Sequence, residues 1–220
     1  MAGLIVGAAA TAAVAATGSP SAPGARTAAR AGGAAPADGA ARADFLDAWR
    51  RSRLSTWLVV LRFERRTSAG RRLTSEVRIA QRPPDRLATG LGSIDARRNG
   101  RRLACTTGPR GALQCRDGGP APPYGQEVDR ELALLRGYLS GPDPLYRVRV
   151  EGGGCYRLEL LVSMPAPPYG RRARFCFDAA TGAPVASEVD RAEATDRQQA
   201  IQVRATVGDA DLAPPAGISS

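Results

Sequence analysis

Residues 57–64 read WLVVLRFE and residues 73–79 read LTSEVRI, and these two stretches decide the fold. Every second residue from Trp57 to Phe63 is apolar, and in the second stretch apolar residues again alternate with polar ones. An alternation with period two is typical of a strand that buries one face. The turn residues Ser-Ala-Gly at 68–70 lie between the two stretches, so the sequence predicts an antiparallel hairpin.

The same alternation recurs along most of the remaining chain. Asn99-Gly100, between two candidate strands, suits a type I′ hairpin turn, in which both central residues have a positive φ. The strands predicted after the first hairpin span 86–91, 94–97, 101–106, 112–116, 145–150, 156–163, 171–177, 184–190 and 200–207. Together with the first hairpin, they predict a mostly antiparallel sheet of about ten strands.

Two segments follow the period of a helix instead. Residues 42–54 are the first, with Asp44 as the expected N-cap. Residues 126–139 are the second, and Gly141-Pro142 ends it. Its apolar stripe consists of Val128, Leu132, Leu135 and Leu139. The predicted fold class is therefore α+β, with one helix leading the sheet and one inserted midway.

The N-terminal region has the composition of a targeting segment. Residues 2–16 form an apolar run without a charge, which is short for a membrane span but suits a signal peptide. No arginine precedes the run, so either translation begins upstream or the segment is an atypical anchor. No cysteine lies near the run, which disfavours a lipid anchor. The predicted layout is a signal peptide or N-terminal membrane anchor over 1–17, a disordered Ala/Gly/Pro-rich tether over 18–41, a single β domain over 42–212 and a disordered tail over 213–220.

The four cysteines indicate export. They form no Cys-x-x-Cys pair and the chain has no histidine, so a zinc site is disfavoured. Cys105 and Cys115 flank a turn signal at 108–111 and are expected to pair across a hairpin, and Cys155 and Cys176, which flank two strand-like runs, are expected to pair as well. The alternative is four buried free thiols. Because disulfides persist in oxidising compartments, we predict an extracytoplasmic protein, either secreted or associated with a membrane through its N-terminal segment.

The charged residues disfavour most catalytic functions and nucleic-acid binding. All 31 basic residues are arginine, and without lysine or histidine the chain cannot form a Ser-His-Asp triad, a histidine metal site, a Schiff base or a Walker A loop. The formal net charge is +10, but acids are interleaved with the arginines, as on the solvated face of a sheet. We therefore predict no nucleic-acid partner, no catalytic residue, no metal site and no cofactor. A third hypothesis is an enzyme that uses a pair of carboxylates, such as Glu188 and Asp190, for acid–base catalysis.

The hexapeptide Pro-Ala-Pro-Pro-Tyr-Gly occurs twice, at 120–125 and at 165–170. One interpretation is a pair of loops that present Tyr124 and Tyr169 to another exported protein, which makes the chain an envelope interaction or regulatory module without a small-molecule ligand. The other interpretation is a pair of stiff polyproline connectors from a composition rich in Ala and Pro.

One short motif carries a resemblance to a known family. Residues 177–185 read FDAATGAPV, with Glu188 after them, and residues 81–86 read QRPPDR. With the order of elements between Asp44 and Pro214, they resemble the periplasmic half-barrel carriers of lipids and lipoproteins: LolA-like proteins, the RseB N-terminal domain and LppX/LprG-like proteins. The chain has no lipobox cysteine, and two local disulfides are not a hallmark of that family, so it looks like a divergent branch.

The resemblance implies a strongly curved, open sheet, a half-barrel, with an apolar inner face and the inserted helix as a partial lid. A groove of roughly several hundred Å³ would hold a lipid or another apolar small molecule, with about 0.8 kcal/mol gained for each buried CH₂. The alternative is that the same side chains form a filled core. The residues expected to contact the ligand are Trp57, Val59, Leu61, Phe63, Val77, Ile79, Leu132, Leu135, Phe175, Phe177, Ile201 and Val203.

Overall fold

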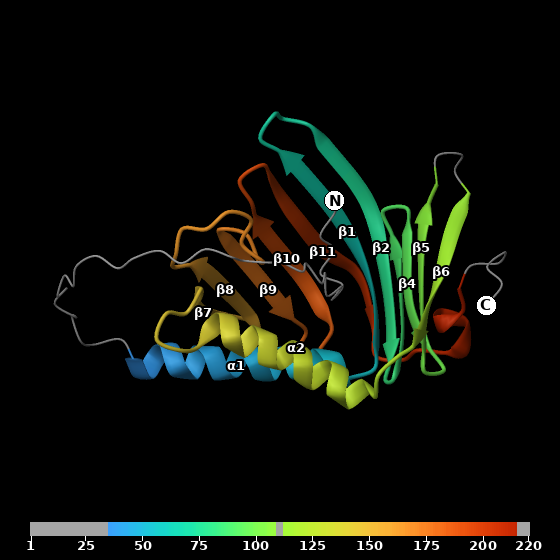
Figure 1. Cartoon of the computed structure of the whole chain (residues 1–220), viewed down its shortest axis with the longest axis horizontal. Helices are drawn as coiled ribbons and strands as arrows, with labels where there is room; N and C mark the ends of the chain where they lie inside the picture. The colour runs from blue at the N-terminus through green and yellow to red at the C-terminus, as the bar shows by residue number, and fades with distance from the viewer. Residues whose placement is uncertain (1–34, 109–111, 215–220) are drawn as a thin grey trace, which may run out of the picture.

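The computed structural model describes residues 35–108 and 112–214, which form one open antiparallel sheet and two helices (Figure 1). The strands are β1 (Trp57–Thr67), β2 (Arg72–Arg82), β3 (Asp85–Gly90), β4 (Ser93–Arg98), β5 (Arg101–Thr107), β6 (Leu113–Pro120), β7 (Tyr146–Gly152), β8 (Cys155–Leu160), β9 (Arg172–Phe177), β10 (Pro184–Asp190) and β11 (Ala194–Arg204). Their order in the sheet is β6-β5-β4-β3-β2-β1-β11-β10-β9-β8-β7. The predicted α+β half-barrel, with a leading and an inserted helix, is confirmed, and its sheet has eleven strands.

The first hairpin lies in the middle of this sheet. β1 pairs with β2 on one side and with β11 on the other, so the first and last strands are neighbours. On β1 and β2, Leu61 lies opposite Val77 and Val59 opposite Ile79. These side chains share the face on which the helices lie, which we call the inner face, and they are buried there.

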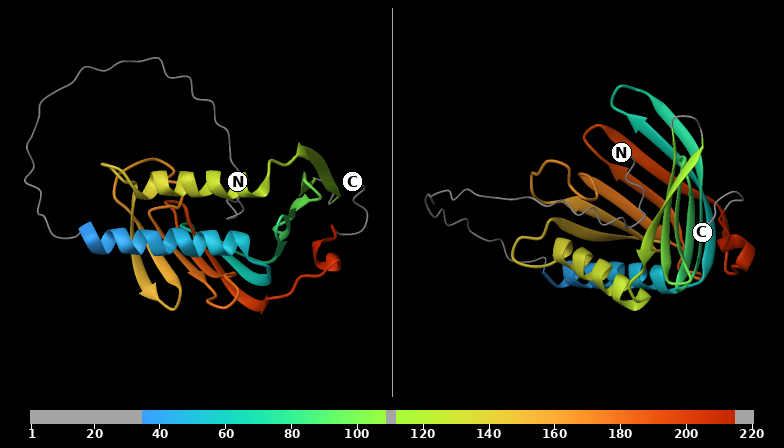
Figure 2. Two further views of the ribbon diagram at one scale, coloured as in Figure 1. Left: turned by 90° about the horizontal axis from the view of Figure 1, so that it is seen from below. Right: turned by 45° about the vertical axis from the view of Figure 1, so that its right-hand side comes forward.

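The helices α1 (Ala35–Leu54) and α2 (Tyr124–Leu139) run in opposite directions, side by side, across one end of the sheet (Figure 2). The predicted stripe of α2 is buried against α1 and the inner face of β7–β9. α1 begins at Ala35 rather than at residue 42, so the prediction of a disordered tether is wrong for residues 35–41, which are helical.

The last strand begins earlier than predicted. β11 starts at Ala194 instead of Ala200, because the polar residues of its first half pair with β1 across the whole register. Asp196 is buried there, and Arg65 of β1 donates a 2.6 Å hydrogen bond from Nη2 to its Oδ2. A charge pair on the inner face thus replaces the apolar alternation on which the prediction relied.

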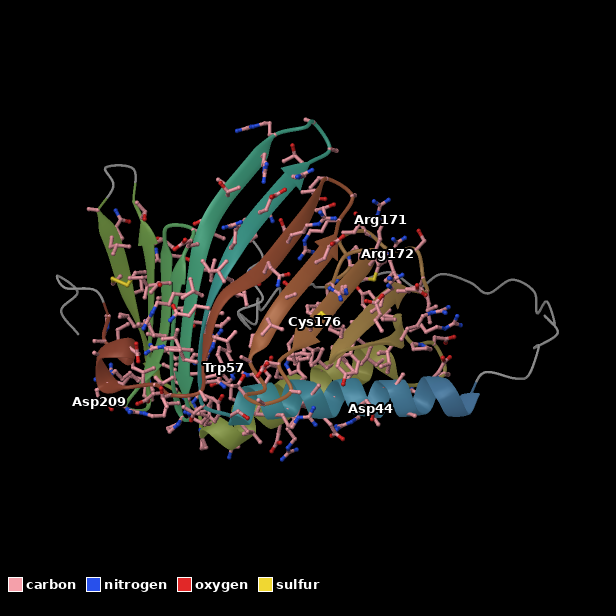
Figure 3. The ribbon with its side chains drawn as sticks, turned by 180° about the vertical axis from the view of Figure 1, so that it is seen from behind. Asp44, Trp57, Arg171, Arg172, Cys176 and Asp209 are labelled. Atoms are coloured by element: carbon pink, nitrogen blue, oxygen red, sulfur yellow. A yellow bond between two sulfur atoms is a disulfide. The ribbon has the colours of Figure 1, made fainter. Side chains whose placement is uncertain are left out.

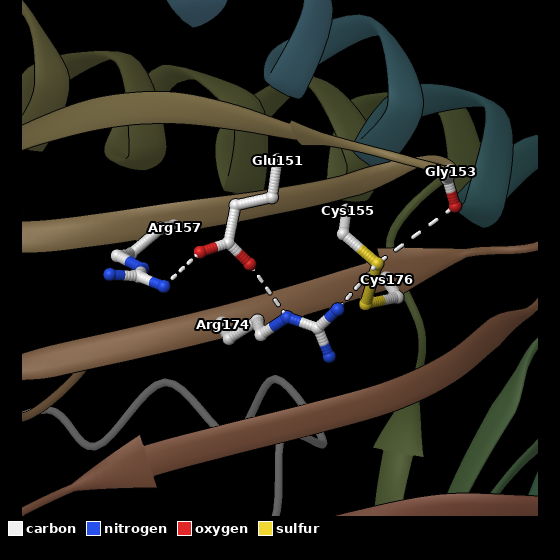
Figure 4. The surroundings of a disulfide bond; sticks show 6 residues. All are labelled: Glu151, Gly153, Cys155, Arg157, Arg174 and Cys176. Carbon is white, nitrogen blue, oxygen red and sulfur yellow. Dashed lines mark hydrogen bonds and ion pairs between the residues drawn. A yellow bond between two sulfur atoms is a disulfide. The ribbon is translucent and has the colours of Figure 1, made fainter.

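Both predicted disulfides are confirmed, and each joins residues directly opposite one another on consecutive strands. Cys105–Cys115 links β5 to β6, and Cys155–Cys176 links β8 to β9. Beside the second bond, Arg174 Nη2 lies 3.1 Å from Cys155 Sγ and Arg174 Nε donates to Glu151 at 2.7 Å (Figure 4). Residues that are neighbours in the sheet and close in sequence therefore carry both cross-links.

The predicted signal peptide or anchor, residues 1–17, and the tether up to residue 34 lie outside the described residues. Between residues 35 and 214, leaving aside 109–111, no helix is long and apolar enough to cross a membrane.

Candidate functional site

A cavity of about 60 Å³, open to solvent, lies where the end of α1 meets the inner face of the sheet. Most of its wall is apolar. Its polar side chains come from the helices (Ser52, Arg53 and Glu131) and from strands β3, β10 and β11 (Arg86, Ser187 and Gln198). Its lining consists of Trp49, Ser52, Arg53, Trp57, Leu61, Ile79, Arg86, Glu131, Phe175, Cys176, Phe177, Pro184, Ala186, Ser187 and Gln198.

Two tryptophans fix the apolar wall. Trp57 lies at the start of β1, close to the end of α1 (Figure 3), and its indole N–H donates to Ser52 O at 2.8 Å. Trp49 packs edge-to-face on Phe175, with ring centroids 5.6 Å apart, and its indole N–H donates to Glu131 Oε1 at 2.8 Å. Each tryptophan thus buries its ring with its one polar atom paired, as a stable wall requires.

The hairpin formed by β9 and β10, which carries the Asp-x-x-Thr-Gly turn at residues 178–182, positions the end of α1. Asp178 Oδ1 accepts hydrogen bonds of 2.8 Å from the backbone N–H and the hydroxyl of Thr181, and these bonds lower the pKa of Asp178 below its usual range. Gly182 follows with a φ of 74°, and a Cβ there would lie 3.3 Å from Ser55 Oγ and 3.5 Å from Arg51. The Asp-x-x-Thr-Gly turn therefore lets the β9–β10 hairpin come close to the last turn of α1.

The predicted ligand-contacting residues fall into three groups. Five of them line the cavity: Trp57, Leu61, Ile79, Phe175 and Phe177. Five others are buried beside it, in the apolar cluster of β1–β3 or under α2: Val59, Phe63, Val77, Leu132 and Leu135.

Ile201 and Val203 lie outside this lining. They are 48% and 37% exposed, whereas the prediction placed them in the apolar groove. The pairing of β1 with β11 shifts register between Val60 and Leu61, opposite this part of β11. The shift interrupts the simple alternation from which both positions were assigned.

The polar end of the cavity was not predicted. Gln81 of β2 is fully buried, and its Nε2 donates at 2.6 Å to Ser52 O and at 2.8 Å to Ser55 O, which ties the end of α1 to the sheet. Arg86 of β3 lies directly opposite Gln81. In sequence both residues occupy inner-face positions of their strands, but only the register of β2 with β3 reveals that they meet.

The outer face carries charges in the pattern expected of a solvated surface. A depression of about 400 Å³ crosses β1, β11, β10, β9 and β8, and arginines and carboxylates alternate along it. Representative ion pairs join Arg72 to Glu64 at 2.6 Å and Arg197 to Glu188 at 3.0 Å. Among the described residues, no three of Cys, Asp and Glu come together in a group that could hold a metal ion.

The tyrosines of the repeated hexapeptide point into the protein. Tyr124 begins α2, its hydroxyl donates to Arg53 O, and its ring lies under the guanidinium of Arg97 at 5.3 Å. Tyr169 packs on Trp49 and Tyr146, and its burial raises the pKa of its hydroxyl. The interpretation that these loops present the two tyrosines to another protein is therefore not supported, because both rings pack against the helices.

Comparison with known proteins identifies distant structural likenesses. No family model and no curated protein sequence matches the chain. Three solved structures are similar to it: a LolA superfamily protein from Nitrosomonas europaea (5% identity, 79% of this chain and 97% of the other, TM-score 0.33), LprF from Mycobacterium bovis (10%, 81% and 98%, 0.36) and a DUF1329 family protein from Desulfovibrio piger (10%, 78% and 94%, 0.33). The first is a member of the superfamily that the sequence resembles. At TM-scores below 0.5, none of the three bears on what this chain binds.

Proposed function

We propose that this chain is a non-catalytic, extracytoplasmic binding protein for a lipid or another hydrophobic ligand, held between the inner face of the sheet and the helices. The observation that carries the proposal is the cavity beside α1, with walls of aromatic and aliphatic side chains and an opening to solvent. Ligand pockets combine such apolar walls with a few polar groups that orient the ligand. The two disulfides support a location in an oxidising compartment.

The size of the cavity sets a condition on binding. About 60 Å³ is far below the roughly several hundred Å³ expected for a groove that holds a lipid. An acyl chain therefore enters only if α1 or α2 moves away from the sheet. A ligand that buries about ten methylenes gains about 8 kcal/mol, which offsets part of the packing lost when a helix moves.

A neutral apolar probe tests this proposal. The purified full-length protein is expected to bind a monoacylglycerol in a fluorescence displacement assay, and lipid extracted from protein expressed with export is expected to appear by mass spectrometry. Ser187 lines the cavity, so the Ser187→Phe variant fills it and is expected to weaken binding by at least tenfold. Ser163→Phe, at an exposed position, is the matched control and is expected to bind as the unmodified protein does.

Two results would overturn the proposal. One is a protein that carries no lipid and binds no monoacylglycerol at any concentration below the solubility limit. The other is equal binding by both phenylalanine variants, which would place the ligand away from the cavity. Circular dichroism and the thermal midpoint of each variant show whether the fold is retained.

A further inference from the structure

We propose that the polar end of this cavity is a subsite for an anionic group, a phosphate or a carboxylate, which Arg86 binds with the help of Arg53. This inference rests on the proposed function and adds to it the chemical class of ligand: an amphiphile whose acidic head lies at the end of α1 and whose apolar part lies along the aromatic wall.

The first observation is a row of arginines on neighbouring strands. Arg86 of β3 lies opposite Arg97 of β4, and Arg97 lies opposite Arg102 of β5. Arg53, from the last turn of α1, lies at the same end of the cavity as Arg86. Like charges directly opposite one another destabilise a sheet unless something compensates them.

Two carboxylates from α2 compensate part of this row. Glu127 Oε2 accepts from Arg97 at 3.0 Å and lies 2.9 Å from Arg102 Nη2. Glu131 Oε2 lies 2.9 Å from Arg53 Nε. Four arginines, Arg53, Arg86, Arg97 and Arg102, thus face these two carboxylates and the more distant Asp95, so one positive charge remains in excess at the end of the cavity.

Arg97 has its hydrogen bonds satisfied. Besides Glu127, its guanidinium donates to the carbonyl oxygens of Pro84 at 2.9 Å and Pro122 at 2.8 Å. Its role is therefore to hold the connection from β6 to α2 in place, so the uncompensated charge does not belong to Arg97.

Arg86 is the arginine without a sufficient partner. Its side chain is 11% exposed, its Nε is buried without a hydrogen bond, and the carboxylate nearest to it, Asp95 Oδ1, lies 3.9 Å from its Nη1, beyond hydrogen-bond distance. Burial lowers the pKa of Arg86, and the neighbouring charge of Arg53 lowers it further. Since a buried charge is stable only when paired, an incoming anion would supply what the site lacks.

Water is the simplest alternative occupant of this site. Gln81 Oε1, directly across from Arg86, is also buried without a donor, so one water molecule could accept from Arg86 and donate to Gln81. Water neutralises no charge, however, whereas a phosphate or carboxylate accepts the N–H groups of a guanidinium and cancels the excess charge. The position of Arg86 in a cavity with a mostly apolar wall favours an acid that carries an apolar tail.

The test compares two lipids that share an acyl chain and differ only in the head. The full-length protein is titrated with lysophosphatidic acid and with monoacylglycerol, and inorganic phosphate is titrated in parallel at constant ionic strength. We expect at least tenfold tighter binding of lysophosphatidic acid. Arg86→Gln is expected to reduce this preference, taken as the ratio of the two affinities measured with the same variant, to less than threefold. Arg62→Gln, on the outer face, is expected to leave both affinities unchanged.

Each outcome separates this inference from the proposed function. Binding of monoacylglycerol without any preference for the phosphate head, or a preference that survives in Arg86→Gln, overturns the anionic subsite and leaves the apolar site standing. If neither lipid binds, the proposed function is refuted. The subsite is then supported, as a site for the free anion, only if inorganic phosphate raises the thermal midpoint of the unmodified protein but not that of Arg86→Gln. If phosphate has no such effect, the subsite is refuted as well. Because Arg86→Gln removes a poorly paired buried charge, its thermal midpoint is expected to match or exceed that of the unmodified protein. If Arg86→Gln does not fold, Arg53→Gln serves as the second variant.

Discussion

The attachment of α1 to the sheet depends on Phe45, and the Phe45→Ala substitution tests how strongly. Phe45 is fully buried, and its ring centroid lies 5.7 Å from Trp49, 5.5 Å from Tyr156 and 6.0 Å from Phe175. Returning a buried aromatic side chain to water costs about 2–3 kcal/mol. The surrounding rings are themselves fixed, so they cannot collapse into the space, and the cavity brings the expected loss to about 3–5 kcal/mol.

Guanidinium chloride unfolding under non-reducing conditions measures this loss. Far-UV circular dichroism and tryptophan fluorescence are followed together, since both tryptophans lie where α1 meets the sheet. Leu134→Ala, on the exposed side of α2 (55% exposed), is the control and is expected to change the free energy of unfolding by less than about 0.5 kcal/mol. A loss below about 1 kcal/mol for Phe45→Ala would show that the packing of α1 contributes little to stability and would refute the reasoning.

Two further predictions concern the cross-links and the acids. Replacing Cys105 and Cys115 by serine removes a disulfide with a sequence separation of 10. The free energy of unfolding, measured in urea against the unmodified protein, is expected to fall by about 3 kcal/mol. An unchanged urea midpoint would contradict this prediction. A hydrogen bond from the backbone N–H of Gly208, with a further one from Arg204, lowers the pKa of Asp211 in the folded protein below the ordinary 3.8. The ionised Asp211 therefore contributes its full stabilisation above pH 3.8, and this contribution is lost as the pH falls through the lower pKa of the folded state. When the free energy of unfolding is measured against pH, Asp211→Asn is therefore expected to lose less stability at acid pH than the unmodified protein does. Asp143→Asn, at an exposed position, is the control and is expected to behave as the unmodified protein. The same loss at acid pH in both variants would contradict this role of Asp211.

The sequence predicts those parts of the structure in which neighbouring residues determine the outcome. The hairpin from Trp57 to Ile79 and both disulfides follow from local alternation and turn signals, and the structure agrees with them. The start of β11 was missed because its first residues are polar, and Arg65, the partner of the buried Asp196, lies 131 residues away in sequence. Such pairing is decided by tertiary contact, which no local pattern contains.

The candidate site divides in the same way. Its apolar wall follows from the side chains that alternate along β1, β2 and β9, so most of it was predicted. Its polar end required the register of Gln81 with Arg86 and of Arg86 with Arg97, and a shift of one residue in either pairing would have separated these side chains. A sequence rich in evenly spread arginine gives no sign of which ones are buried.

The pairing of β1 with β11 has a consequence for biogenesis. β1 is the first strand of the chain, whereas β11, which pairs with its second edge, is the last, so the middle of the sheet stays incomplete until nearly the whole chain is available. Each disulfide, by contrast, joins strands that follow one another in the chain, so neither cross-link depends on the presence of β11. The two flanks of the sheet can therefore be cross-linked before its central pair of strands forms.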